Sequence, residues 1–162
     1  MAAVDYFLKI DGIDGESKDK EFKNHIQIDS WSWSSQQGGT MSAGGGGGAG
    51  KVQMQDFHFT MQMCKATPKL FLHCCNGKHV PKAELNARKA GGDQQKYLKV
   101  TFSDLLVSSY NVSGSGEGAP IPVDQISLNY SKIEYEYKEQ QKDGTLGGPI
   151  KFGYDLKTMK ES

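Results

Sequence analysis

The residues best suited to chemistry in this chain are a run of glycines that ends in a lysine. The run covers residues 44–51, and Gly45, Gly50 and Lys51 have the spacing of the glycines and the lysine of a Walker A loop. In such a loop the backbone amides at the start of a helix hold a phosphate group. A run of glycines also fits a dinucleotide-binding fingerprint and almost any other glycine pattern, so the match alone predicts little.

The residues after the glycine run argue against a nucleotide site. Val52 stands where a magnesium-binding Ser or Thr is needed. Residues 52–60 follow a largely alternating pattern, which predicts a strand where both nucleotide motifs need a helix. We therefore interpret the run as a surface loop. Ordering glycine costs more backbone entropy than ordering any other residue, so an ordered loop here implies a partner that orders it.

His73, Cys74, Cys75 and His79 have the donor atoms of a zinc site. Adjacent cysteines on a helix point about 100° apart, so they do not converge on one ion. Each cysteine follows an apolar residue four positions earlier, which favours buried thiols. We expect the histidines to be ordinary polar-face or turn residues, and we expect no metal to bind.

Side chains suited to hydrolysis are present, but no supporting pattern surrounds them. Ser108 and Ser109 lack a nucleophile-elbow sequence. Glu134 and Glu136 alternate with apolar residues of a strand, which favours solubilising charges on a solvated face. Residues 16–19 are either a polar site or a loop with local hydrogen bonds. The sequence therefore favours a protein that is not an enzyme.

Composition restricts the class of protein further. The 162 residues suffice for one domain with a proper core, and the 19 basic and 19 acidic residues form no long block of either sign. This balance gives little attraction to nucleic acid or to an anionic membrane. No apolar run approaches the roughly 20 residues of a transmembrane helix, and the first residues lack a signal-peptide pattern. Three cysteines, two of them adjacent, form no disulfide framework and fit a reducing origin.

Strand patterns dominate the elements that must position these residues. Alternating apolar residues predict six or seven strands, at about 4–10, 24–35, 51–63, 79–89 with a break near Pro81, 98–102, 125–137 and 150–156. The one predicted helix, at about 68–76, has Thr67 as its candidate N-cap and Gly77 as its candidate C-cap. We expect an all-β, mainly antiparallel domain over residues 1–162, a barrel-like arrangement of two sheets with this short helix packed on it.

The apolar pattern changes phase on both sides of the glycine run. Ile28 and Trp31 lie in opposite phases, and so do Met54 and Phe57. Such switches imply a bulge or a strand that changes its buried face. We therefore predict a long hairpin at about 33–56 whose outer part leaves the body of the domain. The apolar residues that would then need another molecule to cover them are Met41, Val52 and Met54.

Several short stretches of the chain, taken together and in order, form a pattern that is specific to one protein family. They are GESKD (15–19), WSW (31–33), the glycine run, TP (67–68), Cys74, GK (77–78), RKAGG (88–92), LVSS (106–109), LNY (128–130), GP (148–149) and KFG (151–153). This series resembles the haemolysin-coregulated protein (Hcp) family, the tube subunit of the bacterial type VI secretion system. The resemblance covers essentially the whole chain, and it depends on joint order and spacing more than on any single motif.

The resemblance implies a β-barrel-like domain that assembles as a homohexameric ring. Stacked rings would form a hollow tube, driven out of the cell by a contractile sheath on its baseplate and capped by a valine-glycine-repeat spike protein. Effector proteins would be carried and protected in the lumen. The chain would be cytoplasmic before firing and secreted afterwards without a cleaved signal peptide. Neither a cofactor nor membrane insertion is implied.

The resemblance also gives roles to particular residues. The hairpin at about 33–56 resembles the extended loop of the family, which contacts neighbouring subunits and stacked rings. The residues assigned to this contact are Met41, Gly44, Gly45, Gly46, Gly47, Gly48, Gly50, Val52 and Met54. Strand alternation puts Ser32 opposite Trp31 and Trp33, so Ser32 faces outward if the tryptophans face the core. The resemblance implies that outward means toward the lumen.

The residues alone leave two other classes of function open. A monomeric β-sandwich module could bind carbohydrate by stacking Trp31, Trp33 or the tyrosines on sugar rings, and an enzyme could use the glycine loop. The oligomeric state separates these classes, because a ring predicts about six times the 17.8 kDa chain mass. A monomer would favour the binding module, and stabilisation by nucleotide would favour the enzyme.

Overall fold

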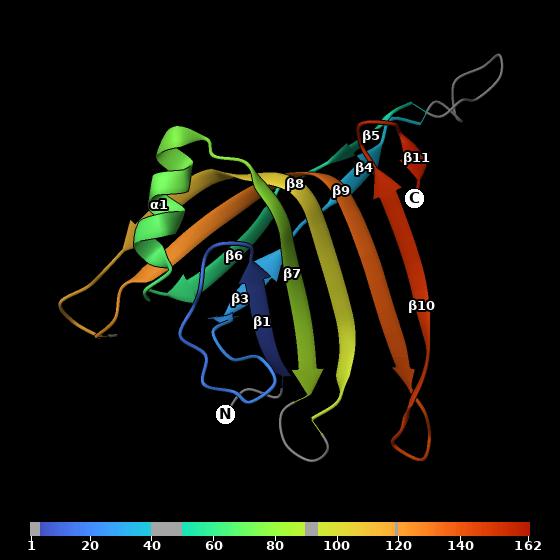
Figure 1. Ribbon diagram of the computed structural model, residues 1–162, viewed down its shortest axis with the longest axis horizontal. Helices are drawn as coiled ribbons and strands as arrows, with labels where there is room; N and C mark the ends of the chain where they lie inside the picture. Colours follow the sequence, from blue (N-terminus) through green and yellow to red (C-terminus); the bar gives the residue numbers. More distant parts are fainter. Residues whose placement is uncertain (1–3, 40–49, 90–93, 119) are drawn as a thin grey trace.

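Antiparallel strands make up most of the protein. The computed structural model describes residues 4–39, 50–89, 94–118 and 120–162. The elements in chain order are β1 (Val4–Ile10), β2 (Ile26–Ile28), β3 (Ser30–Ser32), β4 (Ser35–Gln37), β5 (Val52–Met54), β6 (Phe57–Gln62), α1 (Thr67–Asn76), β7 (Val80–Lys89), β8 (Lys96–Ser113), β9 (Val123–Gln140), β10 (Leu146–Asp155) and β11 (Lys160–Glu161). Their types confirm the expected all-β fold with a short helix (Figure 1).

The long strands β8 and β9 organise the fold because β9 takes part in two layers. β8 pairs with β9 along nearly its whole length, from Leu98 opposite Tyr137 to Ser113 opposite Val123. The first part of β9 also pairs with β6, and its second part pairs with β10. One nine-stranded sheet therefore runs β11-β10-β9-β8-β7-β1-β2, and β6 and β3 branch from it as a second layer (Figure 1).

The folded sheet is barrel-like without closing into a barrel. The chain passes from β2 to β3 through Asp29, whose backbone amide donates to the carbonyl of Thr60 in β6 at 2.8 Å. No strand ladder joins β2 to β3 in the described part of the chain, so at this edge the two layers are connected by this hydrogen bond and by the chain itself. A second, separate sheet is formed by β4 and β5 among the described residues.

The core lies between the two layers and is rich in aromatic rings. The rings of Phe57 in β6 and Phe102 in β8 lie 4.7 Å apart, and both are fully buried. Trp33 packs 6.0 Å from Phe102 and 6.0 Å from Tyr135. Burial of one such ring contributes about 2–3 kcal/mol. These contacts hold β6 and β8 against each other across the core.

The predicted phase switches mark real breaks in the strands. The segment predicted as one strand at 24–35 forms β2, β3 and the start of β4, and the segment at 51–63 forms β5 and β6. Ile28 is buried in β2, which pairs with β1, whereas Phe57 is buried in β6, which pairs with β9. Between β5 and β6, Gln55 donates its amide to the carbonyl of Ser34 at 2.8 Å. The chain changes sheets at these points.

The predicted break near Pro81 is wrong. β7 runs without interruption from Val80 to Lys89. Val80 pairs with Leu105 and Lys82 with Ser103, so the irregular residue Asp104, with a φ of 51°, lies across from Pro81. Because Asp104 interrupts the regular ladder, residue 81 does not need to donate a ladder hydrogen bond. A proline, which has no backbone N–H, is therefore tolerated there.

The helix α1 begins and ends close to the predicted bounds, but its cap differs. Ala66 is the N-cap residue and makes no side-chain cap bond, so the prediction that Thr67 caps the helix is wrong. The Thr67 hydroxyl instead accepts from the amide of Cys64 at 3.1 Å and donates to the buried Asp124 at 2.6 Å. Gly77 is the predicted C-cap, with a left-handed φ of 61°. Among the described residues, no helix has the length and apolarity to cross a membrane.

Candidate functional site

Short polar side chains cover the outer side of β3, β6, the first part of β9 and the end of β8. We call this surface the serine-rich face, and its polar residues are Ser30, Ser32, His58, Thr60, Ser109, Asn111, Gln125 and Ser127. These residues line one depression. None of these described side chains is a lysine, an arginine or a carboxylate, so the surface offers hydrogen bonds with almost no fixed charge.

Hydrogen bonds between strands order the serine-rich face. The Oγ of Ser30 lies 2.6 Å from Oγ1 of Thr60, and Nδ1 of His58 lies 2.5 Å from Oγ of Ser127. At the margin Asp56 accepts from Oγ of Ser108 at 2.6 Å and from Nδ2 of Asn129 at 2.8 Å. Both oxygens of Asp56 therefore have a hydrogen-bond partner. The hydroxyls are therefore held in defined positions.

Ser32 is exposed on this face, opposite His58 in the β3–β6 pair. Trp31 and Trp33 point the other way and pack against the core. Their rings lie 5.3 Å apart, and the ring of Trp31 lies 6.4 Å from that of Phe57. The outward direction of Ser32 thus follows from strand alternation. Its assignment to a lumen remains a prediction.

The predicted hairpin leaves the body as the ribbon of β4 and β5 (Figure 1). Gln37 pairs with Val52, and the amide of Gly50 donates to the carbonyl of Gly38 at 3.2 Å. A Cβ at position 50 would lie 3.0 Å from that carbonyl oxygen, so glycine fits the close approach of the two strands. The other assigned residues, Met41 and Gly44, Gly45, Gly46, Gly47 and Gly48, lie outside the described residues.

Val52 and Met54 are less available than expected. Both are half-buried, and Met54 packs against the core with its Sδ atom 3.8 Å from the hydroxyl of Tyr130. The expectation that Met54 depends on another molecule for cover is therefore wrong, because its own chain supplies contacts. The ribbon bends back over Tyr130 at its base, which the phase pattern did not reveal.

The histidines and cysteines around α1 do not gather. His73 is buried, with Nδ1 2.7 Å from the carbonyl of Lys69, so its expected place on the polar face is wrong. Cys75 is exposed and Cys74 half-buried, so the expectation of a buried thiol fails for Cys75. The helix turns Leu70 and His73, three positions apart, toward the core. The described chain holds no group of three or more potential metal ligands.

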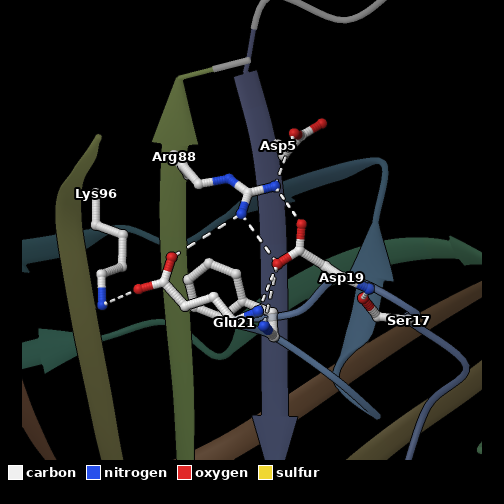
Figure 2. Close-up of polar contacts among 7 residues, drawn as sticks. Asp5, Ser17, Asp19, Glu21, Arg88 and Lys96 are labelled. Carbon is white, nitrogen blue, oxygen red and sulfur yellow. Dashed lines mark hydrogen bonds and ion pairs between the residues drawn. The ribbon is translucent and has the colours of Figure 1, made fainter. Parts of the chain in front are cut away.

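An ion pair with a buried arginine, which the sequence did not reveal, joins β7 to the segment between β1 and β2 (Figure 2). Arg88 of β7 donates from Nη1 to Oδ1 of Asp19 at 3.0 Å and from Nη2 to Oδ2 at 2.8 Å. Asp5 of β1 lies 3.5 Å from Nη2, and the Arg88 side chain is only 4% exposed. Two parallel bonds of this kind fix the orientation of both groups.

The surroundings of this pair hold a loop in place. Oδ1 of Asp19 also accepts from the amides of Glu21 at 2.9 Å and Phe22 at 3.2 Å. The guanidinium of Arg88 lies 5.0 Å from the ring centre of Phe7 and 5.3 Å from that of Phe22. The hydrogen bonds from Arg88 lower the pKa of the Asp19 carboxyl to about 2. The segment between β1 and β2 is thereby clamped onto β7.

A buried carboxylate fixes the start of α1. Asp124 of β9 is fully buried and accepts from the hydroxyls of Thr67 at 2.6 Å and Tyr110 at 3.0 Å. Burial, with a contribution from Asp124, raises the pKa of Tyr110 to about 12. Asp19 and Asp124 thus both have structural partners. Neither is among the residues that line the serine-rich face.

The chain is similar to proteins of one family along almost its whole length. Residues 7–137 match the family described as type VI secretion system effector, Hcp. Protein hcp1 of Pseudomonas aeruginosa is 45% identical over 157 residues, which cover 96% of each chain. The crystal structure of Hcp1 from Salmonella typhimurium has a TM-score of 0.85 at 43% identity and covers 99% of this chain and 100% of its own. A structure of a type six secretion system protein has a TM-score of 0.94 at 32% identity, with the same coverage.

Proposed function

The chain belongs to the Hcp family of type VI secretion proteins, and we propose that it is a tube subunit whose six copies form a ring that stacks into a hollow tube. The observation that carries this proposal is the full-length match, at 45% identity in sequence and a TM-score of 0.94 in fold. Such a protein works by assembly, and the proposal includes no catalytic step.

The serine-rich face is the wall that we assign to the lumen. Short hydroxyl and amide side chains can bind many protein surfaces weakly through hydrogen bonds or bridging water. The absence of Lys, Arg and carboxylates among the described residues of that face avoids strong, selective ion pairs. Ser32 lies exposed on it, opposite His58. Effector proteins that must be held and then released fit such a surface.

The ribbon of β4 and β5 is the part that we assign to contacts with neighbouring subunits and with the next ring. It forms a sheet separate from the main one and extends away from the body (Figure 1). The other proposed partners are the valine-glycine-repeat spike at the tip of the tube, the contractile sheath and the baseplate. The subunit would be cytoplasmic before firing and extracellular afterwards, without a cleaved signal peptide.

The packing of the tryptophans weakens the alternative of a carbohydrate-binding module. Trp31 and Trp33 stack on each other and contact Phe57, so their faces are occupied by the protein's own rings. A sugar platform needs an aromatic face that is open to solvent. The glycine loop is followed by the strand β5, which removes the helix that a phosphate site requires.

Light scattering and electron microscopy of the purified protein test the proposed ring. We expect a particle of about six times the 17.8 kDa chain mass, with a central hole. A monomer throughout a concentration series would contradict the proposal. Export tests the place of the ring in secretion: the chain should reach the medium from cells with a working sheath and stay inside cells that lack it.

A further inference from the structure

Two exposed apolar patches lie toward opposite ends of the subunit, and we propose that they are the two halves of one contact between adjacent copies in the ring. The helix patch consists of Phe71, Leu72 and Cys75 on α1. The strand patch consists of Tyr137 on β9 with Ile150 and Phe152 on β10. In this contact the helix patch of one copy covers the strand patch of the next. The inference rests on the proposed ring and names the surfaces that build it.

The strand patch is the continuation of the core-facing side of the sheet. Ile150 is 66% exposed, and its pairing partner Tyr137 is 42% exposed. Phe152, two residues along the same side of β10, is 49% exposed, and Tyr154, two further on, packs against the core. One side of β10 therefore passes from the packed core into solvent without becoming polar.

The topology explains why this side is uncovered. The second layer pairs with the first part of β9, where Phe57 to Gln62 lie opposite Leu128 to Val123. β10 pairs with the later part of β9, from Lys132 to Gln140. In the described part of the chain, no strand of the second layer reaches across to β10. A sheet buries its apolar side against another element, and here that element comes from outside the subunit.

The helix patch is the side of α1 that the subunit leaves open. Leu70 and His73 face inward, whereas Phe71 is 52% and Leu72 56% exposed. Cys75, one turn after Phe71, is also exposed. The ring of Phe71 lies 4.9 Å from that of Tyr110, which holds it in one position. The result is an ordered apolar ridge about one turn long.

The arrangement of the patches favours a second copy as the occupant of each. They lie toward opposite ends of the longest axis of the molecule (Figure 1). A cyclic ring is built head to tail, so every subunit must use two different surfaces that fit each other. A helix against a sheet is a regular way to complete a layer. The charges of the two elements are opposite in sign, because α1 carries Lys69, whereas Glu139 lies on the same side of β9 as Tyr137.

A cross-link to the native Cys75 tests this contact directly. In the assembled ring, Ile150→Cys and Phe152→Cys each place a thiol in the strand patch. A disulfide needs Cβ atoms about 4 Å apart, and two positions on the same side of β10 allow for the exact seating of the helix. Under mild oxidation we expect at least one variant to give a ladder of linked subunits on a non-reducing gel. The ladder should disappear when Cys75→Ser is added.

The matched control is Lys151→Cys, an exposed position between the two test positions on the opposite side of β10. It should form the ring but no link to Cys75. A hexameric mass for both test variants, with no link from either position to Cys75, would overturn the proposed contact while the ring stands. A monomeric mass for the unmodified protein would overturn the ring and the contact together.

Charge substitutions give a second measurement. Leu72→Glu and Ile150→Glu both put a carboxylate into the proposed contact at positions that are exposed in the subunit. Each should raise the concentration needed for ring assembly by about tenfold or more, since central apolar contacts dominate interface energies. Unchanged assembly of both variants would contradict the contact.

Discussion

Arg88 and Asp19 lie 69 positions apart in the chain and are joined by hydrogen bonds of 3.0 and 2.8 Å. The pair links β7 to the segment between β1 and β2, and the rings of Phe7 and Phe22 flank the guanidinium. Glu21, which also lies 4.0 Å from Arg88, continues the network to Lys96 at 2.8 Å (Figure 2). A segment without a regular strand is thus held by charge and by aromatic packing.

We expect Asp19→Asn to destabilise the protein by about 3 kcal/mol, because it leaves the buried Arg88 charge without its main partner. Urea unfolding at one fixed protein concentration measures the loss, since assembly would otherwise change the apparent stability. The control is Asp14→Asn, an exposed residue of the same segment. Equal effects of the two substitutions would contradict a special role for the pair.

Acid should weaken this pair in a defined range of pH. The pKa of Asp19 is lowered from 3.8 to about 2, chiefly by its hydrogen bonds from Arg88. A lowered pKa in the folded state gives stability that is complete above the unfolded value and is lost as the pH falls through the folded value. The difference in unfolding free energy between the wild type and Asp19→Asn should therefore narrow as the pH falls from 3.8 to about 2. A constant difference over this range would refute the assignment.

Two tyrosines of the folded protein should ionise at a higher pH than free tyrosine does. Burial is the main cause that raises the pKa of both Tyr110 and Tyr130 from 10.0 to about 12. The unfolded chain loses these protons first, so the stability that they contribute is present below pH 10 and is lost as the pH rises toward 12. The ultraviolet absorbance of tyrosinate follows the titration. The step near pH 12 should shrink in Tyr110→Phe and in Tyr130→Phe, and an unchanged step in both would be contrary evidence.

Ser32→Arg should keep the ring but weaken the retention of effector proteins, because it puts a large charge on the serine-rich face. Sizing chromatography measures the ring, and co-purification measures the retained cargo. Ser32→Thr, which keeps the hydroxyl, is the control and should retain cargo. Loss of the ring in the arginine variant would show that the side chain lies in a subunit interface instead.

Deletion of Gly44 to Gly48 should leave rings intact but impair tube growth and secretion, if the tip of the hairpin contacts the next ring. Electron microscopy counts rings and tubes, and the culture medium reports secretion. Replacement of the five glycines by serines keeps the length and serves as the control for shortening alone. Normal tubes from the deletion variant would remove the stacking role.

Local patterns in the sequence were enough for most elements of the fold. Alternation predicted β1 and the outward direction of Ser32. The phase switches around Asp29 and Gln55 predicted a bulge or a change of buried face, and the structure shows that the chain leaves one sheet for another there. These features depend on neighbours in the chain. The continuous course of β7 through Pro81 could not be predicted in the same way, because it depends on an irregular partner in β8.

The parts of the candidate sites that the sequence missed depend on strand pairing over long distances. Asp19 meets Arg88 only because β7 pairs with β1, and nothing in the local sequence of either residue identifies the other. Alternation in β10 predicted an apolar side for Ile150 and Phe152 correctly but could not show that the second layer ends before it. Burial of His73 likewise depends on which side of α1 meets the sheet.

The pairing of β1 with β7 also has a consequence for synthesis on the ribosome. Val4 pairs with Lys89, and Ile10 pairs with Ala83. The first strand therefore leaves the ribosome long before its partner strand β7 has been made. β7 and β8, which are separated by residues 90–95, are the first long pair that can form from neighbouring segments, and β8 and β9 follow. We therefore infer that the sheet of the nascent chain forms from the β7–β8 hairpin outward. β10 is the last long strand to be made, so a half-made chain lacks the exposed apolar side chains of Ile150 and Phe152.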